Sequence, residues 1–163
     1  MDKRKRRSFY ALLILLFLLY LAGLVYVLLF AEAFGRVTQS EEVRYNLILF
    51  KEIIRIYNGR ESIGFWLTFA NLAGNVLGFV PLGFFLPALF PGMRHGMTTV
   101  SACFGFSFLF EMIQLLTKIG CFDVDDLFLN TVGAVLGYLI YVILHAIYRA
   151  LRKKHEVFTA QSK

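Results

Sequence analysis

The sequence predicts an all-α membrane protein, a bundle of four transmembrane helices with one additional interfacial helix on the extracytoplasmic side. Of the 163 residues, 58% are hydrophobic and only 17% are charged, and the mean hydropathy is +0.66. A soluble domain of this size would have too few polar residues to cover its surface. The apolar residues also form four long runs of about 20 residues or more, which matches a hydrocarbon core of roughly 30 Å.

The four runs are continuously apolar, whereas membrane β-strands alternate between apolar and polar residues. We therefore predict helices and not strands. The first run follows a basic segment and is about 23 residues long, which exceeds the apolar region of a signal peptide. No cleavage site of the A-x-A type follows it, so we expect an uncleaved helix. The predicted helices cover residues 8–30, 63–90, 97–117 and 127–148.

Basic residues predict how the spans are oriented in the membrane. We divide the chain into a basic head (1–7), a membrane domain (8–148) and a basic tail (149–163). With both termini in the cytoplasm, eleven of the 17 Lys and Arg residues are cytoplasmic and six lie in the two outer loops. The formal charge of +6 does not indicate a nucleic-acid partner, because the basic runs flank apolar segments. The lipid bilayer is the expected partner, and the head and tail are placed to contact anionic lipid headgroups.

The first outer loop contains a pattern typical of an amphipathic helix. Apolar residues recur at helical spacing over residues 43–57, with charged residues between them. One interpretation is a helix lying on the outer membrane interface. The other, equally compatible with the pattern, is a helix that packs over the mouth of the bundle.

Polar side chains recur within or beside the apolar runs, where their burial is costly and they usually face the bundle interior. Several of these side chains are three or four residues apart, so they share one face of their helix. With the predicted orientation, they all lie at a similar depth in the outer half of the bilayer. We therefore predict a polar pocket that opens outward. Its candidate residues are Asn71, Asn75, Glu111, Gln114, Asp123, Asp125, Asp126 and Asn130.

Each polar group also has a purely structural interpretation. The asparagines can join helices by hydrogen bonds, each worth about 0.6 to 2 kcal/mol. One aspartate, with Asp126 as the example, can cap the fourth helix. For Glu111 we favour a functional role, because a buried carboxylate needs a partner or a raised pKa. Its expected basic partner is Lys118 or an arginine of the first outer loop.

Small residues predict close helix packing, and one proline predicts a local irregularity. Gly74 with Gly78, and Gly133 with Gly137, form G-x-x-x-G pairs that let helix backbones approach. Pro81 removes a backbone donor within the second span and predicts a kink, which would open space beneath the polar residues.

Three segments of the chain resemble the signatures of VanZ-like membrane proteins. Residues 71–84, with Asn71, Asn75 and Pro81, resemble the first signature. Glu111-Met-Ile-Gln114 resembles the central E-x-x-Q element, and residues 123–134 resemble the D-x-D-D-x-x-x-N-T-x-G element. The segment 46–51 also resembles the family's N-L-x-P-F-K stretch, although leucine replaces its proline at position 49. The resemblance covers residues 43–145.

The resemblance implies a bacterial cytoplasmic-membrane protein whose founding relative is associated with teicoplanin resistance. The first functional hypothesis is a non-enzymatic protein that binds a lipoglycopeptide such as teicoplanin or a lipid-linked cell-wall precursor, lowering antibiotic susceptibility. The alternative is an intramembrane enzyme of envelope lipid or wall-precursor metabolism, in which carboxylates provide acid–base groups or hold a divalent cation. A third is a structural or partner-binding module. We expect no cofactor, and no metal motif or disulfide involving Cys103 and Cys121.

Overall fold

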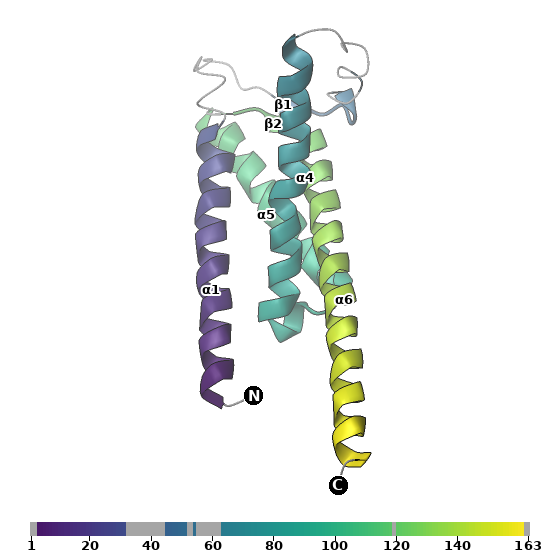
Figure 1. The fold of residues 1–163 in the computed structure, drawn as a ribbon. Coiled ribbons are helices and arrows are strands. Elements are labelled where there is room, and N and C mark those ends of the chain that lie inside the picture. The colour runs from purple at the N-terminus through teal and green to yellow at the C-terminus, as the bar shows by residue number, and fades with distance from the viewer. Residues whose placement is uncertain (1–2, 32–44, 52–53, 55–62, 119, 162–163) are drawn as a thin grey trace.

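The computed structural model describes residues 3–31, 45–51, 54, 63–118 and 120–161, and it is almost entirely helical. A long first helix passes into a short π-helix, and three further long helices follow (Figure 1). The elements are α1 (Lys3–Tyr26), η1 (Val27–Ala31), β1 (Tyr45–Asn46), α4 (Ile63–Leu89), η2 (Pro91–Met93), α5 (Gly96–Thr117), β2 (Phe122–Asp123) and α6 (Val124–Gln161).

Within the described ranges, four helices are long and apolar enough to cross a membrane, which confirms the predicted helical membrane fold. The candidate spans are Arg7–Leu29, Leu72–Leu89, Gly96–Thr117 and Val124–Lys154. The two termini lie at one end of the bundle, and the β1–β2 pair lies at the other (Figure 1). The side of the membrane on which the two ends lie stays a prediction.

The helices α4 and α6 make the most extensive contact among the described elements. Glycines allow this approach: a Cβ atom placed on Gly133 would lie 2.1 Å from the Val76 carbonyl oxygen, and one on Gly137 would lie 2.0 Å from that of Val80. From the opposite side, a Cβ atom on Gly83 would lie 2.1 Å from the Ala134 oxygen. Backbone therefore packs directly on backbone, as small residues permit in membrane helices.

The second predicted glycine pair does not behave in the same way. A Cβ atom on Gly74 would meet nothing within 4 Å among the described residues, and one on Gly78 would meet only the Leu24 side chain at 3.5 Å. The prediction of close backbone packing is therefore confirmed for the α6 pair, whereas the α4 pair makes no such contact with the described residues. The reason is rotational: α4 presents Gly83, not Gly74 and Gly78, to the backbone of α6.

The helix α1 packs at the periphery and is attached mainly through side chains. Phe17 and Leu24 are buried against the bundle, but most of the apolar side chains of α1 are exposed and would face lipid. The Tyr20 hydroxyl donates a hydrogen bond of 2.6 Å to the Gly78 carbonyl oxygen. The Tyr10 hydroxyl donates to the oxygen of Leu89, a terminal carbonyl of α4 that has no partner within its own helix.

Three predicted boundaries differ from the structure. The helix α1 begins in the basic head, at Lys3, and α6 continues through the basic tail to Gln161. Residues 45 and 46 form a strand, so the interfacial helix predicted over 43–57 does not begin at its expected position. Within that segment, the Ile54 amide donates to the Phe50 carbonyl at 2.9 Å. Residues 43–44, 52–53 and 55–57 lie outside the described residues.

Candidate functional site

The end of the bundle opposite the termini carries a cluster of polar side chains, which we call the polar end. It combines the segment 45–50, the last turns of α5, the loop before α6 and the first turn of α6. The β1 and β2 strands are parallel and pair Tyr45 with Phe122 and Asn46 with Asp123. This short pairing connects the segment after α1 directly to the start of α6.

Asp123 caps helix α6 and also binds the β1 strand. Its Oδ1 accepts a hydrogen bond of 2.8 Å from the Asp125 amide, two residues ahead, which is the geometry of an N-cap. The same oxygen accepts a 3.0 Å bond from Asn46 Nδ2. One of the three aspartates is therefore a cap, as the sequence suggested, but it is Asp123 and not Asp126. The capping position follows from the start of the helix at Val124.

Asp125 holds the end of the 45–50 segment. Its carboxylate is buried, and Oδ1 accepts a hydrogen bond from the Phe50 amide. Phe50 has a φ of 66°, a backbone conformation that is costly for a residue with a side chain and needs support from neighbouring contacts. Its ring also packs edge-on against Phe128 of α6, with centroids 5.3 Å apart. A polar and an aromatic contact thus fix one turn of backbone.

Glu111 connects α5 to the same loop. Its side chain is only 3% exposed, and Oε2 accepts a hydrogen bond of 2.8 Å from the Asp123 amide. A backbone donor thus serves as one partner of this buried carboxylate, where the sequence suggested a basic side chain. The arginines of the first outer loop lie outside the described residues. The arrangement of Glu111 with Asp123 fixes the α5–α6 connection.

Asp126 faces the remaining helix of this end, α4. Asn75 Nδ2 donates a hydrogen bond to Asp126 Oδ1, which ties the middle of α4 to the first turn of α6. Asp125 and Asp126 both lie in that first turn. Negative charge there is favourable because the N-terminal end of a helix carries partial positive charge. The side chain of Asn71, also predicted for the site, lies outside the part that the structure describes.

Two amides lie apart from this network and are fully buried. Asn130 is 1% exposed, and its Nδ2 donates a 2.8 Å bond to Ser107 Oγ on α5. Gln114 is 4% exposed, and its Nε2 donates a 2.7 Å bond to the Leu28 carbonyl oxygen in the π-helical turn η1. The eight predicted residues therefore do not all make contact with one another; they divide between the loop network and these two interhelical bonds.

Both amides leave a buried oxygen, Gln114 Oε1 and Asn130 Oδ1, that has no hydrogen-bond partner among the described residues. The assignment for Gln114 follows from chemistry, because only its NH₂ group can donate to the Leu28 carbonyl. A buried acceptor without a donor is costly and rare in native proteins, so it calls for a water molecule or a ligand group. These oxygens are the features of the site with unused binding capacity.

The buried face of α5 is polar along most of its length. Thr99, Cys103, Ser107, Glu111 and Gln114 are all buried and follow one another at intervals of three or four residues, so they share one face. Thr99 Oγ1 donates to the Met93 carbonyl oxygen near the opposite end of the helix. Small polar side chains on this face allow hydrogen bonds to neighbouring helices within the membrane.

Sequence reasoning missed two residues of this arrangement, Asn46 and Ser107. Ser107 lies four residues before Glu111, so helical spacing alone places it on the same face. Asn46 begins the 46–51 segment, but its contact with Asp123 depends on a pairing between segments that are far apart in the sequence. The one feature of the sequence that could have indicated Asn46 is that it is a polar residue at the start of that segment.

The acidic residues do not form a metal site among the described residues. No three His, Cys, Asp or Glu side chains in that part of the chain are grouped so that they could hold a metal ion. Cys103 is buried and Cys121 half-buried, and no disulfide joins them in the described part of the chain. The carboxylates instead accept hydrogen bonds from backbone amides and asparagine side chains.

Comparison with known proteins shows that this site lies within a region matched by a protein-family model. A family model described as VanZ/LLP1 matches residues 17–145. The matched region includes every predicted site residue, the glycines of the α4–α6 contact and the 45–50 segment. No curated protein and no solved structure matches the chain. Since the match covers well over half of the sequence and agrees with the motifs in it, the chain belongs to the VanZ/LLP1 family.

Proposed function

We propose that this VanZ/LLP1-family protein binds an amphiphilic molecule of the cell envelope at its polar end, on the outer side of the cytoplasmic membrane. The ligand is a lipoglycopeptide such as teicoplanin or a lipid-linked cell-wall precursor, and binding lowers the antibiotic susceptibility of the cell. The observation that carries the proposal is the pair of buried acceptor oxygens without partners, on Gln114 and Asn130.

The polar chemistry of the site favours a ligand rich in hydrogen-bond donors. Gln114 Oε1 and Asn130 Oδ1 are acceptors, and the nearby carboxylates of Glu111 and the three aspartates are acceptors when ionised. Sugar hydroxyls, peptide amides and ammonium groups all donate hydrogen bonds. The site therefore suits the headgroup of a glycosylated or peptide-bearing lipid better than an anion.

The apolar surface beside the site favours a ligand that also carries an acyl chain. Tyr45 and Ile48 are each 65% exposed and Leu47 is 63% exposed, on the same segment that Asp123 and Asp125 hold in place. Exposed apolar side chains at the edge of a bilayer lie among lipid tails or against an apolar ligand. Acceptors and apolar side chains thus occur together at one end of the bundle.

Direct binding tests the proposal on the full chain in lipid nanodiscs. Titration with teicoplanin should give saturable binding, and a glycopeptide without an acyl tail should bind at least tenfold more weakly, by roughly 1.4 kcal/mol or more. Gln114→Leu removes the unpartnered oxygen and should weaken teicoplanin binding. Thr117→Val is the matched control, because the exposed Thr117 hydroxyl bonds only to carbonyl oxygens of its own helix.

Susceptibility assays test the resistance part separately. Cells that express the wild-type chain should tolerate more lipoglycopeptide than cells with an empty vector, and Gln114→Leu at equal abundance should lose that difference. Equal susceptibility of wild-type and empty-vector cells across several lipoglycopeptides would reject the resistance role. Absence of teicoplanin binding in nanodiscs, together with no binding of a lipid-linked wall precursor, would reject the binding site itself.

A further inference from the structure

The end of the bundle that carries both termini, which we call the basic end, has two grooves lined by cationic side chains. One lies on α1 and is lined by Lys3, Arg4, Arg7, Ser8, Tyr10, Ala11 and Ile14. The other lies on α6 and is lined by His145, Tyr148, Arg149, Arg152 and Lys153. Neither groove contains residues of the polar end, and the binding proposed there does not use them.

The α1 groove changes from charged to apolar along the helix. Its three cationic residues come first, and Tyr10, Ala11 and Ile14 follow within the next two turns, on the stretch that enters the candidate span. All six of these side chains are exposed. A surface that is cationic at the membrane boundary and apolar below it matches a phospholipid, with its phosphate at the boundary and its acyl chain in the bilayer.

The α6 groove runs in the opposite chain direction, with the aromatic rings of His145 and Tyr148 before its three cationic residues. His145 and Tyr148 lie at the end of the apolar run predicted over residues 127–148, and Arg149, Arg152 and Lys153 follow at helical spacing on the same face. The groove exists because α6 stays helical past the apolar run, which holds the basic side chains in fixed relative positions. In an unfolded tail these charges would not converge on one headgroup.

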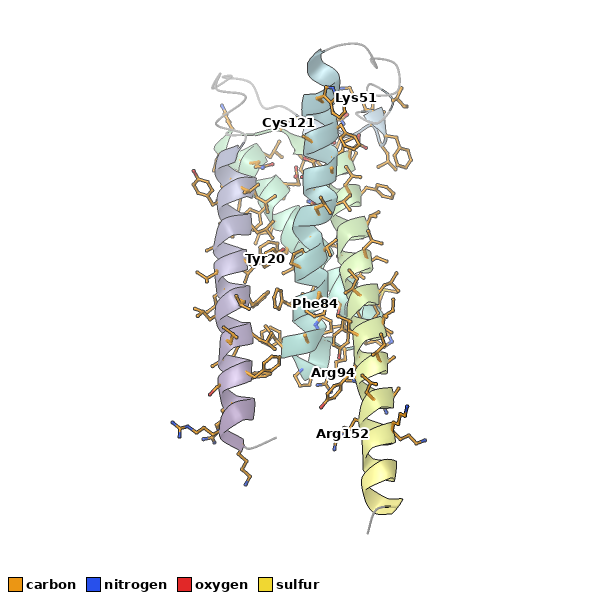
Figure 2. All side chains as sticks on the ribbon, viewed as in Figure 1. Tyr20, Lys51, Phe84, Arg94, Cys121 and Arg152 are labelled. Atoms are coloured by element: carbon orange, nitrogen blue, oxygen red, sulfur yellow. The ribbon has the colours of Figure 1, made fainter. Side chains whose placement is uncertain are left out.

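The charged side chains that line the two grooves are cationic, which favours an anionic occupant. The segments 3–14 and 149–154 contain no acidic residue. Arg94, in the turn between α4 and α5, and Arg152 both lie near this end of the bundle (Figure 2). Several cations held near one membrane surface attract anionic lipids, by about fivefold in affinity for each Lys or Arg.

We propose that the two grooves of the basic end are binding sites for anionic phospholipid, each holding one headgroup phosphate between cationic side chains and its acyl chain along the adjoining apolar residues. The sites are independent of the ligand proposed for the polar end. They anchor the free end of α1 and the extended end of α6 at the membrane surface.

Native mass spectrometry of the full chain, exchanged into micelles with phosphatidylglycerol or phosphatidylcholine, tests this proposal. The wild type should retain up to two phosphatidylglycerol molecules and far less phosphatidylcholine. Arg149→Gln with Lys153→Gln should remove one bound lipid and weaken retention by about tenfold or more. Arg4→Gln with Arg7→Gln should remove the other, while Lys3, Lys5 and Arg6 keep the head basic for topology.

A matched control separates the site from folding and from general charge. Arg149→Lys with Lys153→Arg keeps both charges and should retain the lipid. Equal retention of the two phospholipids by the wild type, or unchanged retention by both glutamine variants, would overturn the proposal. Displacement of the lipid by millimolar inorganic phosphate would also overturn it, because the occupant would then be a free anion and not a phospholipid.

Discussion

Helices α6 and α1 both contact α4, but they do so by different means. Along α6, Gly133 and Gly137 bring backbone against backbone, with no room for a Cβ atom. Along α1, the contact consists of a few buried apolar side chains and hydrogen bonds from tyrosine hydroxyls to α4 carbonyls. The first contact depends on shape and tolerates almost no added volume. The second depends on individual side chains, each of which contributes a small and separable free energy.

The largest expected effect comes from filling the α4–α6 contact. Gly137→Leu would place a branched side chain where even a Cβ atom lies 2.0 Å from the Val80 oxygen. We expect a loss of more than about 3 kcal/mol of stability or a failure to accumulate. Denaturant titration in detergent and the abundance of folded protein measure this. Wild-type stability in Gly137→Leu would mean that the two backbones are not in direct contact.

The next largest loss of stability is expected at the start of α6, where the Asp123 side chain connects this helix to the β1 strand by hydrogen bonds. Asp123→Ala removes the helix cap and the bond to Asn46, and should cost about 1 to 3 kcal/mol. Asp123→Asn keeps an acceptor oxygen for the cap and should cost less. The free energies of unfolding of the two variants, measured in parallel, show whether the acceptor oxygen or the negative charge is needed. An equal loss in both would indicate that the negative charge, not the cap, is what α6 requires.

A smaller effect is expected where α1 meets α4. Tyr20→Phe removes the 2.6 Å bond to the Gly78 oxygen but keeps the ring, and should cost about 0.6 to 2 kcal/mol. The control is Tyr148→Phe, because the Tyr148 side chain is exposed. Stability measured by the same titration should fall only in the first variant. If Tyr20→Phe cost as much as Gly137→Leu, the proposed distinction between the two contacts would be wrong.

The smallest effect is expected at the glycine that lies outside both contacts. Gly74→Ala adds a methyl group into space with no described atom within 4 Å, and alanine favours helix over glycine. We expect stability to change by less than about 1 kcal/mol, towards stabilisation. A clear loss in the titration would show that Gly74 packs against a part of the chain outside the described residues.

Much of the fold could be predicted because its elements depend on local sequence. Apolar run length places the helices, and the structure confirms α4 at Ile63–Leu89 and α5 at Gly96–Thr117 to within a residue or two. The polar spacing also gave the shared face of Glu111 and Gln114. Hydrophobicity did not reveal that α6 continues to Gln161, because a basic segment can be helical outside the membrane without being apolar.

The candidate site was predictable by residue but not by contact. The sequence singled out Asn75, Glu111 and the three aspartates, and the structure places their hydrogen bonds at one end of the bundle. Which partner each one takes depends on the pairing of Asn46 with Asp123, across 77 residues, and no local pattern encodes that distance. The outward-opening pocket remains a prediction that ligand binding must test.

Sequence alone indicated four apolar segments long enough to cross a membrane and predicted that the costly polar residues share one depth, because length, hydrophobicity and helical spacing are local properties. Only the tertiary structure decided how those residues are used. Within the described residues, Asp123 caps α6, Gly137 and not Gly74 makes a close contact, and Gln114 Oε1 and Asn130 Oδ1 are buried without donors. The physical reason is that the partner of each polar residue depends on how the helices are rotated about their axes and on which distant segments pack together. Neither property can be predicted from a single stretch of sequence.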